Sequence, residues 1–129
     1  MRLTPLLLGI GVAFVAAQSA HAQDPVKVSP GLYKILLEND QVRVLEFRIP
    51  PGQKEAMHHH PASVVYVLSD GRAKSTTPKG ETQIIESKSG QAVWMDSVTH
   101  SWEPIVGDGH VVIVEVKRPA GRPAQAKKP

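Results

Sequence analysis

The chain of 129 residues contains no cysteine. Disulfide bonds are therefore excluded, and the fold must depend on core packing, with a bound metal ion or a partner subunit as the remaining aids. The sequence also lacks a glycine-rich phosphate loop and a Ser–His–Asp set that can be placed on a common fold. After the N-terminal segment, no long stretch repeats its apolar residues with the 3.6-residue period of a helix. These absences turn attention to β structure and to histidine chemistry.

The formal net charge of +3 is unevenly distributed along the chain. Four cations lie near the ends, namely Arg2, Arg122, Lys127 and Lys128, and residues 23–118 carry about −1. The basic character therefore belongs to the ends, and no basic surface with interleaved aromatic residues is found. The sequence predicts no nucleic-acid partner.

The N-terminal segment "MRLTPLLLGIGVAFVAAQSAHAQDP" has the features of a secretory signal peptide. Arg2 precedes an apolar stretch over residues 6–17, which is too short to favour a membrane-spanning helix. Ala20 and Ala22 form a small-x-small cleavage site before Gln23. We predict that residues 1–22 are removed and that the protein is exported to the periplasm or secreted, with no transmembrane segment in the mature chain. The alternative is an uncleaved membrane anchor.

The remaining chain predicts one domain over residues 23–118 and a disordered basic tail, "PAGRPAQAKKP", over residues 119–129. Short runs of β-forming residues follow one another within the domain, among them "SVVYVL", "TQIIESK" and "HVVIVEVKR". Turn sequences such as "SDG", "PKGE" and "GDG" separate them. This pattern is typical of an all-β sandwich or barrel.

The segment "EAMHHHPASVVYVLSDG" contains three of the six histidines. In an extended strand successive side chains point to opposite faces, so His58 and His60 share a face while His59 points away. Two such imidazoles can bind one metal ion if a third group reaches it. The alternative is a histidine cluster on the surface.

The spacing of this segment resembles the first sequence motif of the cupin superfamily. Gly52 is followed by five residues, then by His58-x-His60, and the segment closes at Gly71. The family pattern has a glutamate ligand between the second histidine and the last glycine. Here Val64 occupies that position.

A later segment, "SGQAVWMDSVTHSW", is similar to the second cupin motif, which supplies a further histidine ligand. Gly90 opens the segment and His100 closes it, whereas Ser97 replaces a usual glycine and "SWEP" stands in the usual asparagine region. The resemblance implies a jelly-roll β-barrel with one divalent metal ion bound by His58, His60 and His100. Iron, zinc, nickel, copper and manganese are not distinguished by this ligand set.

Other residues are candidates for the walls of the pocket or for contacts with the ligand histidines. Glu46 could provide an inward carboxylate near the metal. Val64 and Tyr66 have the same parity as His60, so we expect them to face the cavity. We expect Trp102 in the core or at the cavity mouth and His59 either in solvent or behind the ligands. The full candidate list is Glu46, His59, Val64, Tyr66 and Trp102.

The resemblance leaves several functions open. Some cupin-like dioxygenases of small thiols use three histidines and no carboxylate, which favours a metal-dependent, oxygenase-like enzyme acting on a small molecule. The alternative is a non-catalytic cupin that binds or senses a small ligand at a degenerate metal site, and the third possibility is a scaffold with a dead site. The sequence is also similar to that of small single-domain bacterial cupins. Some of these are described as β-alanine degradation proteins, a role that fits poorly with export.

The resemblance also implies a homodimer, because small cupins often associate through their N-terminal strands. The first strand of this domain has an apolar face. We expect Leu32, Ile35 and Leu37 to be buried between the two copies.

Overall fold

The computed structural model describes residues 23–118, so the predicted signal peptide and the predicted disordered tail lie outside the described residues. One short helix precedes nine strands. The elements are α1 (Pro25–Val28), β1 (Tyr33–Glu38), β2 (Val42–Ile49), β3 (Glu55–His60), β4 (Ser63–Val67), β5 (Gly71–Thr76), β6 (Thr82–Ser87), β7 (Ala92–Met95), β8 (Val98–Val106) and β9 (Gly109–Val116). No helix among them is long and apolar enough to span a membrane.

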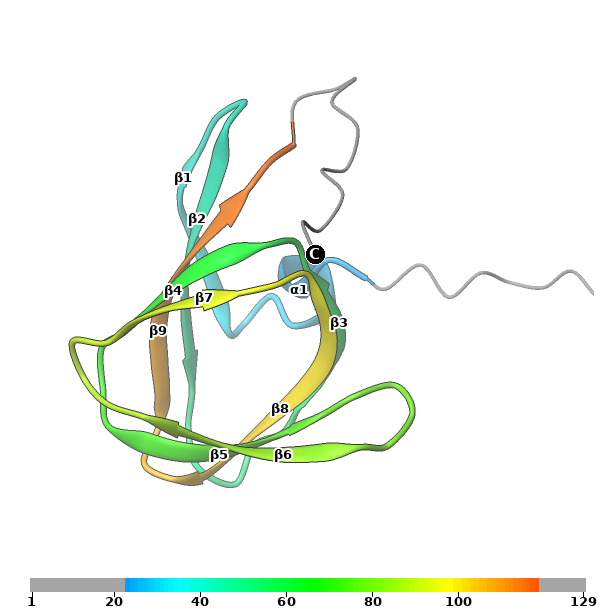
Figure 1. Ribbon diagram of the computed structural model, residues 1–129, viewed down its shortest axis with the longest axis vertical. Helices are drawn as coiled ribbons and strands as arrows, with labels where there is room; N and C mark the ends of the chain where they lie inside the picture. Colours follow the sequence, from blue (N-terminus) through cyan, green and yellow to red (C-terminus); the bar gives the residue numbers. More distant parts are fainter. Residues whose placement is uncertain (1–22, 119–129) are drawn as a thin grey trace, which may run out of the picture.

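The strands form two antiparallel sheets that face each other around a central space (Figure 1). The five-stranded sheet has the order β1-β2-β9-β4-β7, and the four-stranded sheet has the order β3-β8-β5-β6. Consecutive strands often lie in different sheets, as β2 and β3 do, and this crossing is what closes a jelly roll. The predicted all-β, jelly-roll barrel is confirmed.

The core occupies the space between the inner faces of the sheets. Alternation along β2 places Leu45, Phe47 and Ile49 inward, and all three are buried. Tyr33 of β1 and Ile113 of β9 complete this cluster. Burial of each large apolar side chain stabilises the fold by about 1.5–3 kcal/mol, which provides cohesion that disulfides do not supply here.

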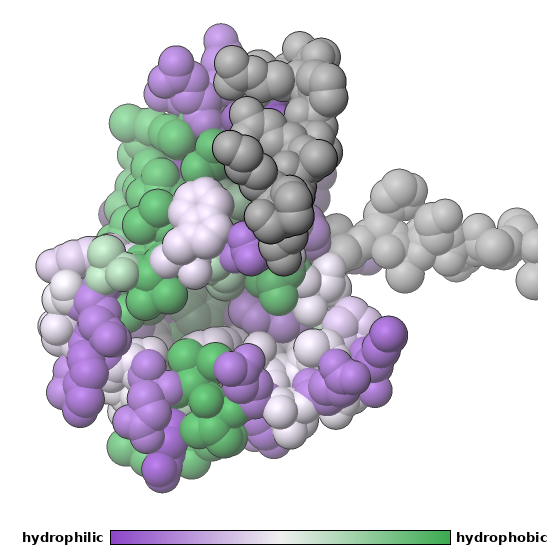
Figure 2. Space-filling model, viewed as in Figure 1, coloured by the Kyte–Doolittle hydropathy of each residue, from purple (hydrophilic) through white to green (hydrophobic). Residues whose placement is uncertain are grey.

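The outer face of the five-stranded sheet carries an apolar row that crosses every strand. Leu37 pairs with Val44, Val44 with Val114, Val114 with Val64, and Val64 with Trp94. Leu37 is 49% exposed and Trp94 is 58% exposed. Figure 2 shows apolar residues gathered over this part of the molecule. We refer to these five residues as the outer row.

The three apolar residues expected at the dimer contact lie in different surroundings. Leu32 precedes β1 and packs, partly buried, against the core of its own chain. Ile35 and Leu37 are 45% and 49% exposed, so these two residues remain available at the surface.

Candidate metal centre

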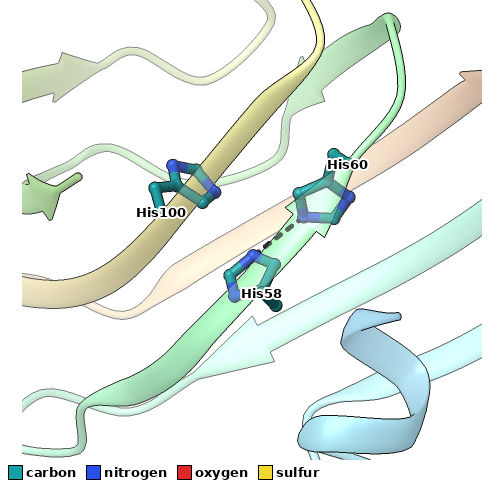
Figure 3. Close-up of side chains that lie close together, drawn as sticks. All are labelled: His58, His60 and His100. Carbon is teal, nitrogen blue, oxygen red and sulfur yellow. Dashed lines mark hydrogen bonds between the residues drawn. The ribbon is translucent and has the colours of Figure 1, made fainter. Parts of the chain in front are cut away.

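Neighbouring strands of the four-stranded sheet bring the three predicted ligands together. His58 and His60 lie two residues apart on β3, and both point into the barrel (Figure 3). His100 lies on β8, where it is the register partner of His58. Because paired residues on antiparallel strands have their side chains on the same face, His100 faces the same space as the pair on β3.

The three imidazoles converge and are withdrawn from solvent. One ring nitrogen from each histidine lies within 4.8 Å of those of the other two. Nε2 of His58 and Nε2 of His60 are 3.0 Å apart. The relative exposures of His58, His60 and His100 are 0%, 2% and 8%.

The second ring nitrogen of each histidine has a partner in the protein. Nδ1 of His58 lies 2.8 Å from the carbonyl oxygen of Ala56. Nδ1 of His60 lies 2.8 Å from Oε1 of Glu115, and Nδ1 of His100 lies 3.1 Å from Oγ of Ser75. A carbonyl and a carboxylate only accept hydrogen bonds, so His58 and His60 carry their protons on Nδ1. Their Nε2 atoms are therefore free to act as ligands.

This arrangement fits a divalent cation. Burial, together with the neighbouring histidines, lowers the pKa of His100 to about 3, and burial lowers the pKa of His58 to about 4. Both rings are thus neutral at pH 7, as metal ligation requires. Two lone pairs facing each other at 3.0 Å repel unless a cation lies between them. Imidazole nitrogens at about 2.0–2.1 Å from one ion, on adjacent coordination positions, are roughly 3 Å apart.

A buried carboxyl group lies beside the histidines. Glu55 is 2% exposed, accepts a hydrogen bond of 2.5 Å from the hydroxyl of Tyr33, and has Oε1 3.3 Å from Nδ1 of His58. Glu55 pairs with Trp102 while His58 pairs with His100, so β3 has one extra residue over this interval. This bulge turns Glu55 to the inner face, although it lies three positions before His58 and a regular strand would place the two on opposite faces.

A cavity of about 300 Å³ opens next to these groups. Figure 2 shows a hollow between the two sheets near the centre of the view. Tyr33, Glu55 and the three histidines form one part of its wall. The rest is mainly apolar and includes Val65, Val67, Ala73, Ile85, Val98, Trp102, Val111 and Ile113. Such a cavity admits a small organic molecule with its polar end toward the histidines.

The remaining predicted candidates lie in different places. Trp102 lines the cavity, with its ring centroid 6.0 Å from that of His100. His59 points away from the cluster, and its ring nitrogens lie 3.0 Å from Oγ1 of Thr99 and 3.3 Å from Oγ of Ser97. Glu46 is on the outer face of β2, where its carboxylate contacts Nε2 of His110 at 2.9 Å. It is therefore not an inward carboxylate near the metal.

The expectation that Val64 and Tyr66 face the cavity was wrong. They are 37% and 45% exposed on the outer face of β4, whereas Ser63 and Val67 are buried and Val65 packs against the core. The parity of His60 does not extend to them because β3 and β4 belong to different sheets. The chain changes direction between the two strands, so the alternation restarts at Ser63.

Four residues of the site were missed by sequence reasoning, namely Tyr33, Glu55, Ser75 and Glu115. Glu115 had a readable signal, because it is an acidic residue within the valine-rich run "HVVIVEV" and has the same parity as the buried Ile113. Ser75 had no such signal. Tyr33 and Glu55 become neighbours of the histidines only through the bulge in β3 and the pairing of β1 with β2.

Comparisons with known proteins give structural relatives only. No protein-family model matches the chain, and no curated protein matches it. A cupin domain from Bordetella pertussis is 26% identical with a TM-score of 0.60, over 67% of this chain and 92% of that chain. A conserved protein of unknown function from Streptococcus pyogenes is 25% identical with a TM-score of 0.51, over 69% of this chain and 75% of that one.

A third structure, a protein with a double-stranded β-helix domain from Klebsiella pneumoniae, is 21% identical with a TM-score of 0.54. The match covers 69% of this chain and 78% of that chain. At this identity the likeness concerns the fold alone. It agrees with the two facing sheets described above.

Proposed function

Because this chain is a small protein of the cupin superfamily, we propose that it binds one divalent metal ion through His58, His60 and His100. The observation that carries the proposal is the convergence of three buried ring nitrogens, two of which belong to histidines whose Nδ1 proton is held by an acceptor. A bound ion would supply Lewis acidity or an oxygen-binding position.

We propose further that the site is that of an oxygenase-like enzyme acting on a small molecule. An enzyme of this kind needs a proton donor or acceptor near the reacting atoms, and Glu55 with Tyr33 is such a pair. Burial raises the pKa of Glu55 to about 8, so its carboxyl group keeps a proton at neutral pH. The hydroxyl of Tyr33 lies 3.5 Å from Nε2 of His60, on the side where the ligand nitrogens converge.

The alternative is a binding or sensing module that holds a small ligand in the cavity without turnover. The mainly apolar wall of the cavity favours retention of a ligand as well as its conversion. Oxygen uptake by the iron-loaded protein, tested against a panel of small thiols and small organic acids, separates the two. Ligand binding without oxygen uptake would support the module.

The metal proposal is tested by titrating the purified protein with Zn²⁺ and Fe²⁺ and measuring bound metal per chain. We expect one ion per chain, and we expect His58→Ala, His60→Ala and His100→Ala each to lose it. His59→Ala is the matched control, because it removes the middle residue of the same tripeptide while its ring contacts Thr99 instead. An equal loss in His59→Ala would point to nonspecific binding by surface histidines.

We also propose that the protein is exported and assembles as a homodimer. Export is supported by the signal-peptide pattern of residues 1–22. N-terminal sequencing of protein recovered from the cell envelope or medium should begin at Gln23. The dimer is supported by the outer row, which crosses all five strands of one sheet and includes the exposed Leu37, Val64 and Trp94.

A further inference from the structure

A continuous series of hydrogen-bonded polar side chains runs from His60 to Asp24, near the N-terminal end of the described residues. Nδ1 of His60 lies 2.8 Å from Oε1 of Glu115. Nε of Arg43 donates to Oε2 of the same carboxylate at 2.7 Å, and Nη1 of Arg43 donates to Oδ2 of Asp24 at 2.7 Å. These hydrogen bonds connect β3, β9, β2 and the residue that caps α1.

This series of side chains is well shielded from solvent at the end that lies next to the histidine cluster. The side chains of His60 and Glu115 are 2% and 3% exposed, that of Arg43 is 13% exposed, and that of Asp24 is 31% exposed. Asp24 is itself held, since its Oδ1 accepts a hydrogen bond of 2.9 Å from the backbone nitrogen of Val26. Glu115, Arg43 and Asp24 therefore each have two hydrogen-bonding partners in the protein.

The chemistry of these groups determines the form of the His60 ring. Arg43 has only donors, so both oxygens of Glu115 act as acceptors, one for Arg43 and one for His60. His60 therefore carries a proton on Nδ1, and in the neutral ring its Nε2 is the unprotonated nitrogen that faces the inside of the barrel. Although burial opposes ionisation, hydrogen bonds from His60 and Arg43 keep the pKa of Glu115 below its ordinary value.

We propose that Glu115 is a positioning residue for His60, and that Arg43 and Asp24 hold Glu115 in place. The proposal rests on the proposed metal site and adds three residues to it, all of them outside the ligand set. Glu115 selects the ring form in which Nε2 is the ligand, and it fixes the ring plane. Carboxylates that accept the outer N–H of a ligand histidine commonly change metal affinity by about 10–100-fold when removed.

The test is Glu115→Gln, because it keeps the shape of the side chain and replaces one carboxylate oxygen, a hydrogen-bond acceptor, by an amide nitrogen, a hydrogen-bond donor. Arg43 still requires an acceptor, so the amide oxygen turns toward Arg43 and the amide nitrogen turns toward His60. An amide N–H pointing at Nδ1 favours the other ring form, in which Nε2 carries the proton. We expect the ¹⁵N signals of the His60 ring, assigned with His60→Ala, to shift to that form in the metal-free protein.

The second measurement is Zn²⁺ affinity, where we expect Glu115→Gln to weaken binding by about 10–100-fold. Glu46→Gln is the matched control, since Glu46 also contacts a histidine, at 2.9 Å from His110, but on the outer face. It should retain the affinity of the parent. An unchanged ring form together with unchanged affinity in Glu115→Gln would overturn the proposal.

The two measurements separate this proposal from the proposed function. If the parent binds no zinc, the metal site fails, while the ring form of His60 in the metal-free protein still decides whether Glu115 positions it. If Glu115→Gln does not fold, Asp24→Asn takes its place as the test variant. Asp24 is the most exposed member of the series of side chains, so its substitution perturbs the fold less. Asp24→Asn should weaken zinc binding to a smaller extent, and unchanged His60 signals and affinity would contradict the proposal.

Discussion

The hydroxyl of Tyr33 and the carboxyl group of Glu55 form a hydrogen bond of 2.5 Å next to the three histidines. Among residues 23–118, no lysine or arginine forms an ion pair with Glu55. Burial therefore governs this carboxyl group and raises its pKa to about 8. Burial and the charge on Glu55 also raise the pKa of Tyr33, which stays a neutral donor.

The first prediction concerns the stability of the metal-free protein between about pH 4.5 and pH 8. The native state keeps the proton of Glu55 up to about pH 8, whereas the unfolded chain releases it near 4.5. Stability is therefore lost as the pH rises through this range, by up to about 1.4 kcal/mol per pH unit. Glu55→Gln should flatten this decline. Urea unfolding of both proteins at several pH values measures it, and parallel curves would contradict the assignment.

The second prediction concerns acid. The pKa values of His58 and His100 are lowered to about 4 and about 3 in the native state. As the pH falls below about 6.5, the unfolded chain therefore binds protons at these two residues while the native state does not. The metal-free protein should lose stability as the pH falls from about 6.5 toward 4, with up to about 1.4 kcal/mol per pH unit from each ring. His100→Gln should show a shallower acid limb in the same unfolding experiment. An unaltered limb would mean that His100 is not a buried neutral base.

The third prediction tests the inner face of β4. Val65 lines the cavity and Val64 faces solvent. Val65→Glu places a carboxyl group against apolar walls and should cost about 1–3 kcal/mol in the metal-free protein. Ile84→Glu is the control, because Ile84 is exposed on β6 of the other sheet, away from the outer row, and it should stay within about 0.5 kcal/mol of the parent. Urea unfolding of both variants without metal measures the difference, and equal losses of stability would contradict the placement of Val65 on the inner face.

The fourth prediction concerns the homodimer. Leu37→Lys inserts a charge into the outer row and should shift the protein to the monomer mass in light scattering at micromolar concentration. Ile84→Lys is the matched control, since Ile84 is 52% exposed but lies on β6 of the other sheet. The control should remain a dimer. A parent protein that is already monomeric would refute the dimer itself.

The sequence predicted the features that depend on local alternation. His58 and His60 share a face because both lie on one uninterrupted half of β3, and His100 joins them because it pairs directly with His58. The short strands and their turns were also readable. Gly52 and Gly90, for example, have φ angles of +83° and +88°, which glycine adopts without strain.

Features that depend on breaks in alternation or on distant pairing could not be predicted. The position of Glu55 requires a bulge whose presence is not encoded by a recognisable turn sequence. The outward placement of Val64 requires knowledge that β3 and β4 belong to different sheets. Glu115 reaches His60 across 55 positions of sequence, so only the register of β9 between β2 and β4 brings it into contact.

β3, the strand that carries His58 and His60, is also an edge strand of its sheet. An open strand edge is a template on which another chain can add a strand. Here the backbone N–H of His59 is occupied by the carbonyl oxygen of Gln23, the buried Pro25 begins the helix that packs against β3, and Pro61 follows the strand without an N–H group. The N-terminal residues thus protect the histidine strand from intermolecular strand addition. A chain shortened by residues 23–28 would expose this edge and should aggregate.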